Sequence, residues 1–281
     1  MVPASVNLVC APFLAVAVTT AACAEHRAVT SVQIAAGTDT RRAAATPRAL
    51  GLGAMDASVA ARDAGARSAI DLVRVDGGSP NVPSAAYIDS FWIDRTEVTV
   101  AAYAECVRAG SCSPPSTDGI DRRSIRYCNW GSAEKTTHPI NCVDWDEALA
   151  YCAWRGERLP SEQEWLLAAM GTDGRTFPWG DAPPGDQVCW GLSAVATLGT
   201  CAVGSYPAGA APCGALDMAG NVWEWTADAY DAEGTLRTIR GGSWATNADD
   251  PSALTASSRG KSAHGTRSIG VGFRCARGDP A

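Results

Sequence analysis

Eleven cysteines in a chain of 281 residues constrain its fold more than any other feature of the sequence. No two of them form a Cys-x-x-Cys pair, the ligand spacing that is usual in structural zinc sites. Cysteines at this density without such pairs favour disulfides, which persist in oxidising compartments. The sequence therefore predicts a disulfide-braced protein that is exported to the extracellular space, the periplasm or the cell envelope.

The beginning of the chain has the features of a signal peptide, predicted over residues 1–22. Residues 11–22 form an apolar stretch of suitable length, and small residues follow it. Two outcomes stay open here: cleavage after Ala24, and lipidation of Cys23 as in a bacterial lipoprotein. Because no apolar run approaches the ~18 residues that span a bilayer, membrane contact is expected only through such a lipid anchor.

A change in composition divides the rest of the chain. Residues 23–70 are rich in Ala, Arg, Thr and Gly and contain few large apolar residues, which predicts a disordered tether. All Trp and Tyr residues lie after residue 86, where they provide the core of one domain. We place this domain at residues 71–278.

Charge and histidine content exclude several classes of function. The chain carries 23 Lys and Arg against 30 Asp and Glu, and this balance disfavours nucleic acid as a partner because phosphate binding depends on basic surface. Of the histidines His26, His138 and His264, only the last two lie in the predicted domain, so a three-histidine metal centre is excluded there. No phosphate-binding loop or nucleophile elbow is present.

Local patterns predict short elements before residue 171 and irregular structure after it. Alternation of apolar and polar residues predicts strands over 72–75 and 86–93, and a helix is expected over 99–109. The later part is dense in Gly, Pro and Trp, which favours a compact fold with little regular secondary structure.

Two further helices have matched start signals. Asp144 and Glu147 have the spacing of a capping box, in which each side chain bonds the other residue's backbone N–H. Ser161 and Glu164 repeat the pattern, and the helix that they begin is expected to end at Gly171.

Four sequence blocks carry more information than composition. They are Phe-Trp-Ile-Asp-Arg-Thr-Glu-Val-Thr at 91–99, Trp-Arg-Gly-Glu-Arg-Leu-Pro-Ser-Glu-Gln-Glu-Trp at 154–165, Asp-Met-Ala-Gly-Asn-Val-Trp-Glu-Trp at 217–225, and Arg-Gly-Gly-Ser-Trp at 240–244, closed by Gly-Phe-Arg-Cys at 272–275. In this order and spacing they closely resemble the formylglycine-generating enzyme family, whose domain is also called the sulfatase-modifying factor domain. The resemblance implies an α+β fold that is a variant of the C-type-lectin-like fold.

The resemblance also implies one structural calcium site. Family members hold the ion through an acidic or amide side chain, two backbone carbonyls and a glutamate, which correspond to Asp217, Gly220, Val222 and Glu224. Hard oxygen ligands of this kind suit Ca²⁺. Taken alone, Glu224 lies between two Trp residues and needs a partner if it is buried. The family's other calcium site is expected to be lost, because residues 187–190 lack its asparagine.

The chain departs from the family at the catalytic cysteines. Oxidases of the family bind Cu(I) through two cysteines, whose positions correspond to Thr246 and Pro251 here. Residues 244–256 contain neither Cys nor His, so a small shift in alignment does not restore the pair. Copper is therefore not expected.

Four further residues correspond to positions that line the family's peptide groove. They are Arg240, Ser243, Trp244 and Arg259. An arginine beside Gly-Gly is equally suited to holding the carbonyls of a tight turn, so both roles stay open for Arg240.

Most cysteines of the domain can be paired. The resemblance implies a disulfide between Cys152 and Cys275. Proximity in sequence suggests three more pairs and leaves Cys213 over: Cys106 with Cys112, Cys128 with Cys142, and Cys189 with Cys201.

The sequence thus favours a binding or accessory module whose partner is a peptide or protein. Two alternatives stay open, a formylglycine-generating oxidase that acts on protein cysteine and a carbohydrate-binding, lectin-like module. The iron-dependent sulfoxide synthases that share the fold need three histidines, which the predicted domain does not provide.

Overall fold

The computed structural model describes residues 71–191 and 199–279, so the predicted signal peptide and tether lie outside the described residues. Described helices and strands are β1 (Leu72–Val75), β2 (Phe91–Asp94), α2 (Val100–Arg108), α3 (Trp145–Trp154), α4 (Glu162–Met170), β3 (Trp223–Ala229), β4 (Leu236–Arg240), β5 (Arg259–Ala263), β6 (Val271–Gly272) and β7 (Ala276–Gly278). Short 3-10 helices are η1 (Ile125–Tyr127), η2 (Ala133–Lys135), η4 (Pro207–Gly209) and η5 (Pro251–Leu254).

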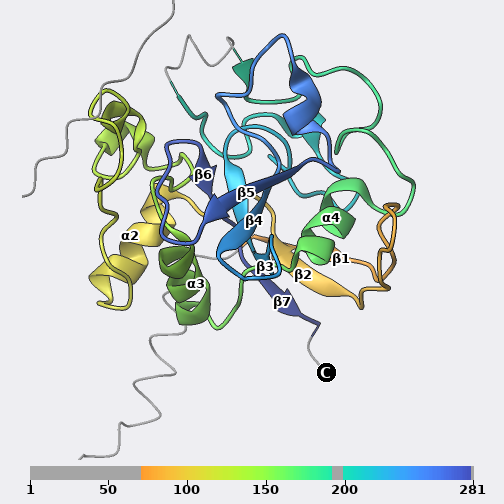
Figure 1. Ribbon diagram of the computed structural model, residues 1–281, viewed down its shortest axis with the longest axis horizontal. Helices are drawn as coiled ribbons and strands as arrows, with labels where there is room; N and C mark the ends of the chain where they lie inside the picture. Colours follow the sequence, from red (N-terminus) through yellow and green to blue (C-terminus); the bar gives the residue numbers. More distant parts are fainter. Residues whose placement is uncertain (1–70, 192–198, 280–281) are drawn as a thin grey trace, which may run out of the picture. The chain divides into compact units, whose positions relative to one another are not determined.

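The described strands form two separate sheets (Figure 1). The smaller has the order β1-β2-β7 and is antiparallel, with Ile93 of β2 opposite Val73 on one side and Ala276 on the other. The larger has the order β5-β4-β3-β6, in which only the β3–β6 pair is parallel. Much of the remaining backbone is loop, so the expected α+β class with little regular secondary structure is confirmed.

The predicted helix starts are confirmed by their capping contacts. Thr99 caps α2 by accepting from Ala102 N at 3.1 Å. Capping boxes open both α3 and α4, through the residue pairs that the sequence pattern indicates. Gly171 ends α4 with φ of 62°, a left-handed conformation that glycine adopts at little cost.

The strand predicted over residues 86–93 is shorter than expected. Its regular pairing begins at Phe91, and upstream of it Ile88 forms only an isolated bridge with Gly78. Between these two points Gly77 N donates to the Ser90 hydroxyl at 3.0 Å. A side chain thus takes the place of a ladder carbonyl, which ends the regular β1–β2 pairing.

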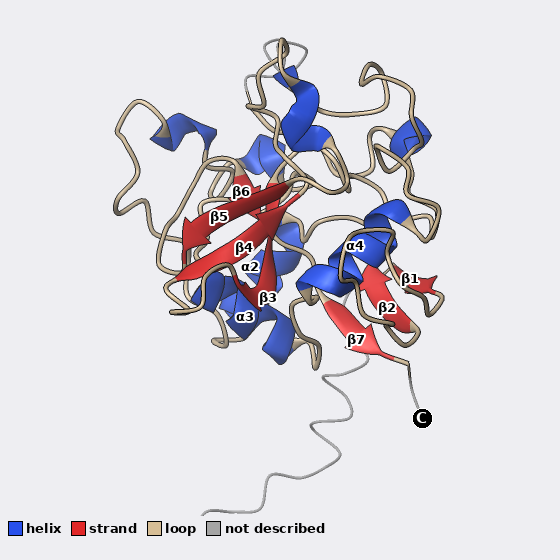
Figure 2. Cartoon of the chain, turned by 45° about the vertical axis from the view of Figure 1, so that its right-hand side comes forward, coloured by secondary structure: helices blue, strands red, loops and turns tan. Residues whose placement is uncertain are grey.

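Two apolar clusters stabilise the sheets. Helices α2 and α3 pack beside the larger sheet, where the rings of Tyr103, Tyr151 and Phe273 contact one another (Figure 1). Helix α4 packs on the smaller sheet through residues that include Trp165 and Leu167 (Figure 2). The apolar faces of α2 and α3 therefore contribute to one core of the domain, and that of α4 contributes to another.

Four disulfides brace the described chain. They are Cys106–Cys112, Cys128–Cys142, Cys152–Cys275 and Cys189–Cys201, the pairs that the resemblance and sequence proximity indicate. Cys213 is the free cysteine among the described residues, and its thiol lies 3.4 Å from the carbonyl of Ala168. Burial raises the pKa of this thiol, so it is kept in the unreactive protonated form.

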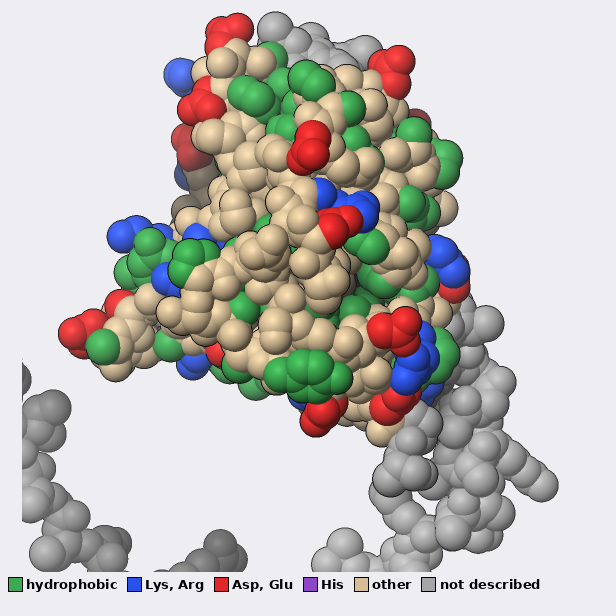
Figure 3. Space-filling view, turned by 90° about the vertical axis from the view of Figure 1, so that its right-hand side faces the viewer, with side chains coloured by type: hydrophobic (Ala, Val, Ile, Leu, Met, Phe, Trp, Pro, Cys, Tyr) green, Lys and Arg blue, Asp and Glu red, His purple; other side chains and the backbone are tan. Residues whose placement is uncertain are grey.

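The face of the molecule in Figure 3 carries acidic and basic side chains interspersed with apolar ones. No described helix is long and apolar enough to cross a bilayer.

Candidate functional site

A hollow of about 360 Å³ lies beside the Gly-Gly-Ser-Trp block. It is lined by Gly191 and by residues 244–249. The half-buried ring of Trp244 contacts Tyr127 with 5.3 Å between centroids, and its Nε1 donates to Ile269 O at 3.2 Å. We call this hollow the Trp244 cleft.

The two positions that correspond to the copper cysteines have structural contacts in this region. Thr246 Oγ1 accepts from Ser243 N at 3.1 Å, and Thr246 N donates to Ser243 O at 3.0 Å. Pro251 is the first residue of η5, whose start is capped by Asp250 accepting from Ser252 N at 3.1 Å. A hydroxyl in a turn and a proline ring at a helix start therefore occupy the two positions that the resemblance assigns to the copper cysteines.

The groove candidates separate into two groups. Trp244 lines the cleft, whereas Arg240 is buried and donates to the carbonyls of Ser257 at 2.8 Å and Ser258 at 2.7 Å. Ser243 is also buried, and its hydroxyl accepts from Ala245 N at 3.3 Å. Arg240 thus has the turn-holding role that the sequence left open.

Arg259 joins Arg240 in binding one carboxylate. Its Nε and Nη2 lie 2.7 and 3.0 Å from the Glu162 carboxylate oxygens, and its guanidinium lies 4.1 Å from the Tyr230 ring centroid. Burial alone would raise the pKa of Glu162, but hydrogen bonds and charge from Arg259 and Arg240 outweigh it and lower that pKa. The two arginines therefore fix the start of α4 to the larger sheet.

Behind the cleft lies an amide network that sequence reasoning missed. Asn141 is fully buried and donates to Tyr127 O at 2.9 Å and to Ile269 O at 2.7 Å. The first carbonyl belongs to the residue whose ring contacts Trp244, and the second accepts from the Trp244 indole. Asn141 thus holds the backbone that supports Trp244 and the neighbouring Tyr127, through contacts between distant segments that no local pattern encodes.

The two histidines of the domain, His138 and His264, contact different partners. His138 Nδ1 lies 2.9 Å from the Thr200 hydroxyl, whereas exposed His264 lies 3.2 Å from Asp146. Burial, and then the charge of Lys135, lower the pKa of His138.

This shift predicts a loss of stability in mild acid. In the unfolded chain a histidine takes up a proton near pH ~6.5. The folded protein binds that proton only at lower pH, so the unfolded state binds more protons in between and the free energy of unfolding falls as pH decreases below about 6.5. Urea unfolding at pH 7.5 and 5.5 should show a smaller pH effect for His138→Gln than for the wild type. An identical pH effect in both proteins contradicts the assignment.

The acidic residues of the expected calcium site, Glu224 and Asp217, lie in one buried region. Glu224 is fully buried, and both of its oxygens accept from Arg274 at 2.7 Å, while Trp165 Nε1 donates to one of them at 2.8 Å. Asp217 is buried beside it and accepts from Gly204 N at 2.6 Å. The partner that Glu224 needs is therefore an arginine.

Glu97 belongs to the same buried region and was missed by sequence reasoning. It is 2% exposed, its Oε1 has no hydrogen-bond partner, and its Oε2 lies 3.4 Å from Asn221 Nδ2. Burial, followed by the charge of Asp217, raises the pKa of Glu97 well above its usual range. Burial likewise raises the pKa of Asp217. Its neighbours belong to distant segments, so they could not be read from the sequence.

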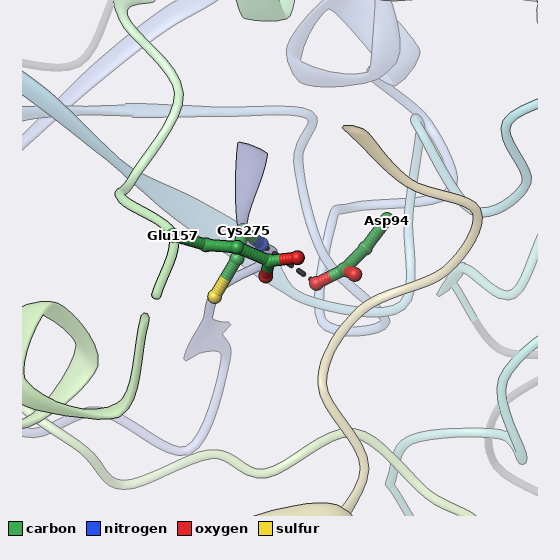
Figure 4. A group of neighbouring side chains, drawn as sticks. All are labelled: Asp94, Glu157 and Cys275. Carbon is green, nitrogen blue, oxygen red and sulfur yellow. Dashed lines mark hydrogen bonds between the residues drawn. The ribbon is translucent and has the colours of Figure 1, made fainter. Parts of the chain in front are cut away.

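A second buried acidic group, Asp94 and Glu157 beside Cys275, is shown in Figure 4. Arg155 binds Asp94 at 2.6 and 2.9 Å and Glu157 at 2.7 Å, and the sulfur of Cys275 is in a disulfide. Arg155 binds both carboxylates and the Cys275 sulfur is not a free thiolate, so we assign this group to an ion pair and not to a metal centre.

Comparisons with known proteins agree with the motifs. The chain matches the model of the sulfatase-modifying factor enzyme 1-like domain over residues 26–279. It is 38% identical over 165 residues to the inactive C-alpha-formylglycine-generating enzyme 2 of Bos taurus, covering 53% of each chain. It is 31% identical over 246 residues to the formylglycine-generating enzyme of Streptomyces coelicolor, covering 66% of this chain and 77% of that one. The match thus spans about half of the first relative's length.

Solved structures show the same fold. CarF matches with a TM-score of 0.60 and 22% identity, covering 75% of this chain and 99% of that one. PvdO from Pseudomonas aeruginosa matches with a TM-score of 0.59 and 23% identity, covering 74% and 94%. Because the family model matches most of the sequence, the chain belongs to the family of sulfatase-modifying factor enzyme 1-like domains.

Proposed function

We propose that this domain is a binding or accessory module that takes a peptide or protein segment in the Trp244 cleft and does not carry out the copper-dependent oxidation. The observation that carries the proposal is the chemistry of residues 246 and 251, a hydroxyl and a proline ring in place of two thiolates. Cys213 is the free cysteine among the described residues, and its thiol contacts the carbonyl of Ala168 in α4. It does not line the cleft.

The contacts of the cleft favour binding. Its main apolar surface is the Trp244 ring, which Tyr127 and the Asn141 network hold in place. Beside that ring, Asn247 and Asp249 offer polar groups that can orient a ligand. A rigid aromatic ring with a few polar groups is typical of recognition sites, because little side-chain entropy is lost on binding.

We further propose that the protein is exported and that it reaches the membrane, if at all, through lipid on Cys23. The disulfides support an oxidising compartment. Intact-mass measurement of the secreted or envelope-bound protein distinguishes cleavage after Ala24 from acylation at Cys23.

Two measurements test the proposed function. In the first, Cu(I) is titrated into the purified chain, which is then assayed for oxygen-dependent oxidation of a cysteine-containing peptide. We expect that the chain neither binds one copper ion per molecule nor oxidises the peptide, because the cleft offers no thiolate pair. Copper bound at one ion per chain with peptide oxidation contradicts the proposal.

In the second, a display library of extended peptides and a glycan array are screened against the chain. We expect peptide binding that Trp244→Ala weakens about tenfold or more, as is usual for an aromatic residue at the centre of an interface. Tyr87→Ala is the matched control, because Tyr87 is 70% exposed and lines a different hollow. Binding confined to the glycan array favours the carbohydrate alternative instead.

A further inference from the structure

Strand β7 forms one edge of the smaller sheet, and part of that edge is unpaired (Figure 2). On the side that faces away from β2, Ala276 exchanges two backbone hydrogen bonds with Arg158, at 2.8 and 3.0 Å. In a strand, alternate residues turn their N–H and C=O groups to the same side. Gly278 therefore turns both of its backbone groups to the free side of β7, where the described residues provide no partner for them.

The segment that pairs with Ala276 does not continue along β7. In an antiparallel ladder the position opposite Gly278 would fall to Gly156. Gly156 instead belongs to the turn that ends α3, with φ of 78° and its N–H donating to Ala153 O at 3.0 Å. Gly278 is exposed, and a β-carbon built on it would meet no atom within 4 Å. The edge is therefore open to a strand from another molecule.

A hollow of about 550 Å³ adjoins this edge. Its lining includes Gly278, Arg158, Glu164 near the start of α4, and the exposed ring of Tyr87. We call it the β7 hollow, and it shares no lining residue with the Trp244 cleft. Residues directly opposite each other on neighbouring strands point their side chains to the same face. A residue paired with Gly278 would therefore direct its side chain to the face that carries the hollow.

Arg158 presents unused donors at this hollow. Its Nη1 donates to Glu164 Oε2 at 2.6 Å and to Leu159 O at 3.3 Å, and its Nη2 donates to Glu164 Oε1 at 2.6 Å. A guanidinium has five N–H groups, so the Nε–H and one Nη2–H remain. These two lie on one edge of the group, and that edge can bind a carboxylate bidentately. The side chain is 46% exposed, so a ligand can reach it.

Other arginines of the chain show that this chemistry is available. Arg259 binds Glu162 through its Nε and Nη2, the same edge that Arg158 leaves free. A guanidinium can also serve two acidic partners, since Arg155 Nη2 lies 2.6 Å from an Asp94 oxygen and 2.7 Å from a Glu157 oxygen. The ion pair with Glu164 therefore does not prevent Arg158 from binding a second carboxylate.

We propose that the β7 hollow binds an extended peptide, which adds a strand at Gly278 and places one acidic side chain on the free edge of Arg158. The backbone of Gly278 supplies main-chain hydrogen bonds, and the guanidinium selects the acidic residue. Tyr87 offers an apolar surface to a neighbouring side chain. Asp89 also lines the hollow, so a peptide with a single acid fits better than a run of acids. This site does not depend on the function proposed for the Trp244 cleft.

The test measures fluorescence polarisation of labelled peptides mixed with the purified full-length chain. The probes are two pools of capped heptapeptides with Thr or Val at the outer positions, which favour an extended conformation, and either Glu or Gln at the centre. We expect the Glu pool to bind about tenfold more tightly than the Gln pool, because only the carboxylate makes charge-assisted hydrogen bonds with Arg158. Trp244→Ala should leave both affinities unchanged.

Two substitutions separate the contributions of the side chain and the backbone. Arg158→Lys keeps a cation beside Glu164 but lacks the second pair of donors, so it should remove the preference for Glu. Gly278→Pro removes the free N–H and should weaken both pools about tenfold. Gly278→Ala is the matched control, because it keeps the N–H and should bind like the wild type.

Hydrogen exchange of the wild type provides a readout that does not depend on the folding of a variant. The Gly278 amide should exchange more slowly when the Glu pool is present at saturation, because its N–H then lies in a strand ladder.

The proposal is overturned if the wild type binds neither pool, if Arg158→Lys keeps the preference for Glu, or if Gly278→Pro binds as well as Gly278→Ala. An unprotected Gly278 amide in the presence of bound peptide overturns it as well. Binding that Trp244→Ala removes and Gly278→Pro retains would place the peptide in the Trp244 cleft. That result would exclude the β7 hollow and leave the function proposed for the cleft intact.

Discussion

Replacing Glu224 by glutamine is expected to lower the free energy of unfolding by about 3 to 5 kcal/mol, because the amide carries no charge and turns an NH2 group toward donors of Arg274 or Trp165 from which the carboxylate oxygens accept. Both side chains are at most 1% exposed, so water cannot take over the lost contacts. Urea unfolding followed by circular dichroism measures the change.

A double variant that removes both partners of the buried ion pair serves as the control. In the double variant Glu224→Gln/Arg274→Met the guanidinium donors that face the glutamine amide are removed as well, so part of the lost stability should return relative to Glu224→Gln alone. A loss below about 1 kcal/mol for Glu224→Gln would mean that Arg274 is compensated by another group.

Removal of the Cys152–Cys275 disulfide is expected to destabilise the domain by about 4 to 5 kcal/mol. The bond joins α3 to the residue that precedes β7 across a separation of 123 residues, and closing so long a loop removes much conformational entropy from the unfolded chain. The double variant Cys152→Ala/Cys275→Ala, unfolded with urea, measures the loss.

The shortest loop provides the comparison for this prediction. Cys106 and Cys112 are separated by 6 residues, and the same entropic estimate gives about 2 kcal/mol for their bond. The double variant Cys106→Ala/Cys112→Ala should therefore lose about half as much stability. Equal losses in the two double variants would show that the stabilisation does not come from loop closure.

The local elements of the fold were readable from the sequence because their signals lie within a few residues. The capping boxes at Asp144 and Ser161 depend on contacts between residues three positions apart, and the structure contains both. The premature end of the pairing before Phe91 was not readable. It depends on the contact between Ser90 and Gly77, which belong to different segments.

Some features of the candidate site were likewise readable from the sequence, and others were not. The absence of a cysteine pair at Thr246 and Pro251 is a matter of residue identity, so the sequence alone establishes it. The role of Arg240 and the position of Asn141 depend on carbonyls far away in the chain, and only the structure places them together.

By itself, the sequence determined the family, the helix starts and the missing cysteines at positions 246 and 251, because each follows from residue type and spacing. It indicated three disulfides by proximity, whereas the pair of Cys152 and Cys275 was implied by the family resemblance. Only the tertiary structure decided that Arg274 is the partner of Glu224 and that Glu97 and Asp217 lie beside each other in the same buried region. Charge balance in a buried site depends on which groups fold into contact. Glu97 and Asp217 are separated by 120 residues of chain, and no local pattern reports that they meet.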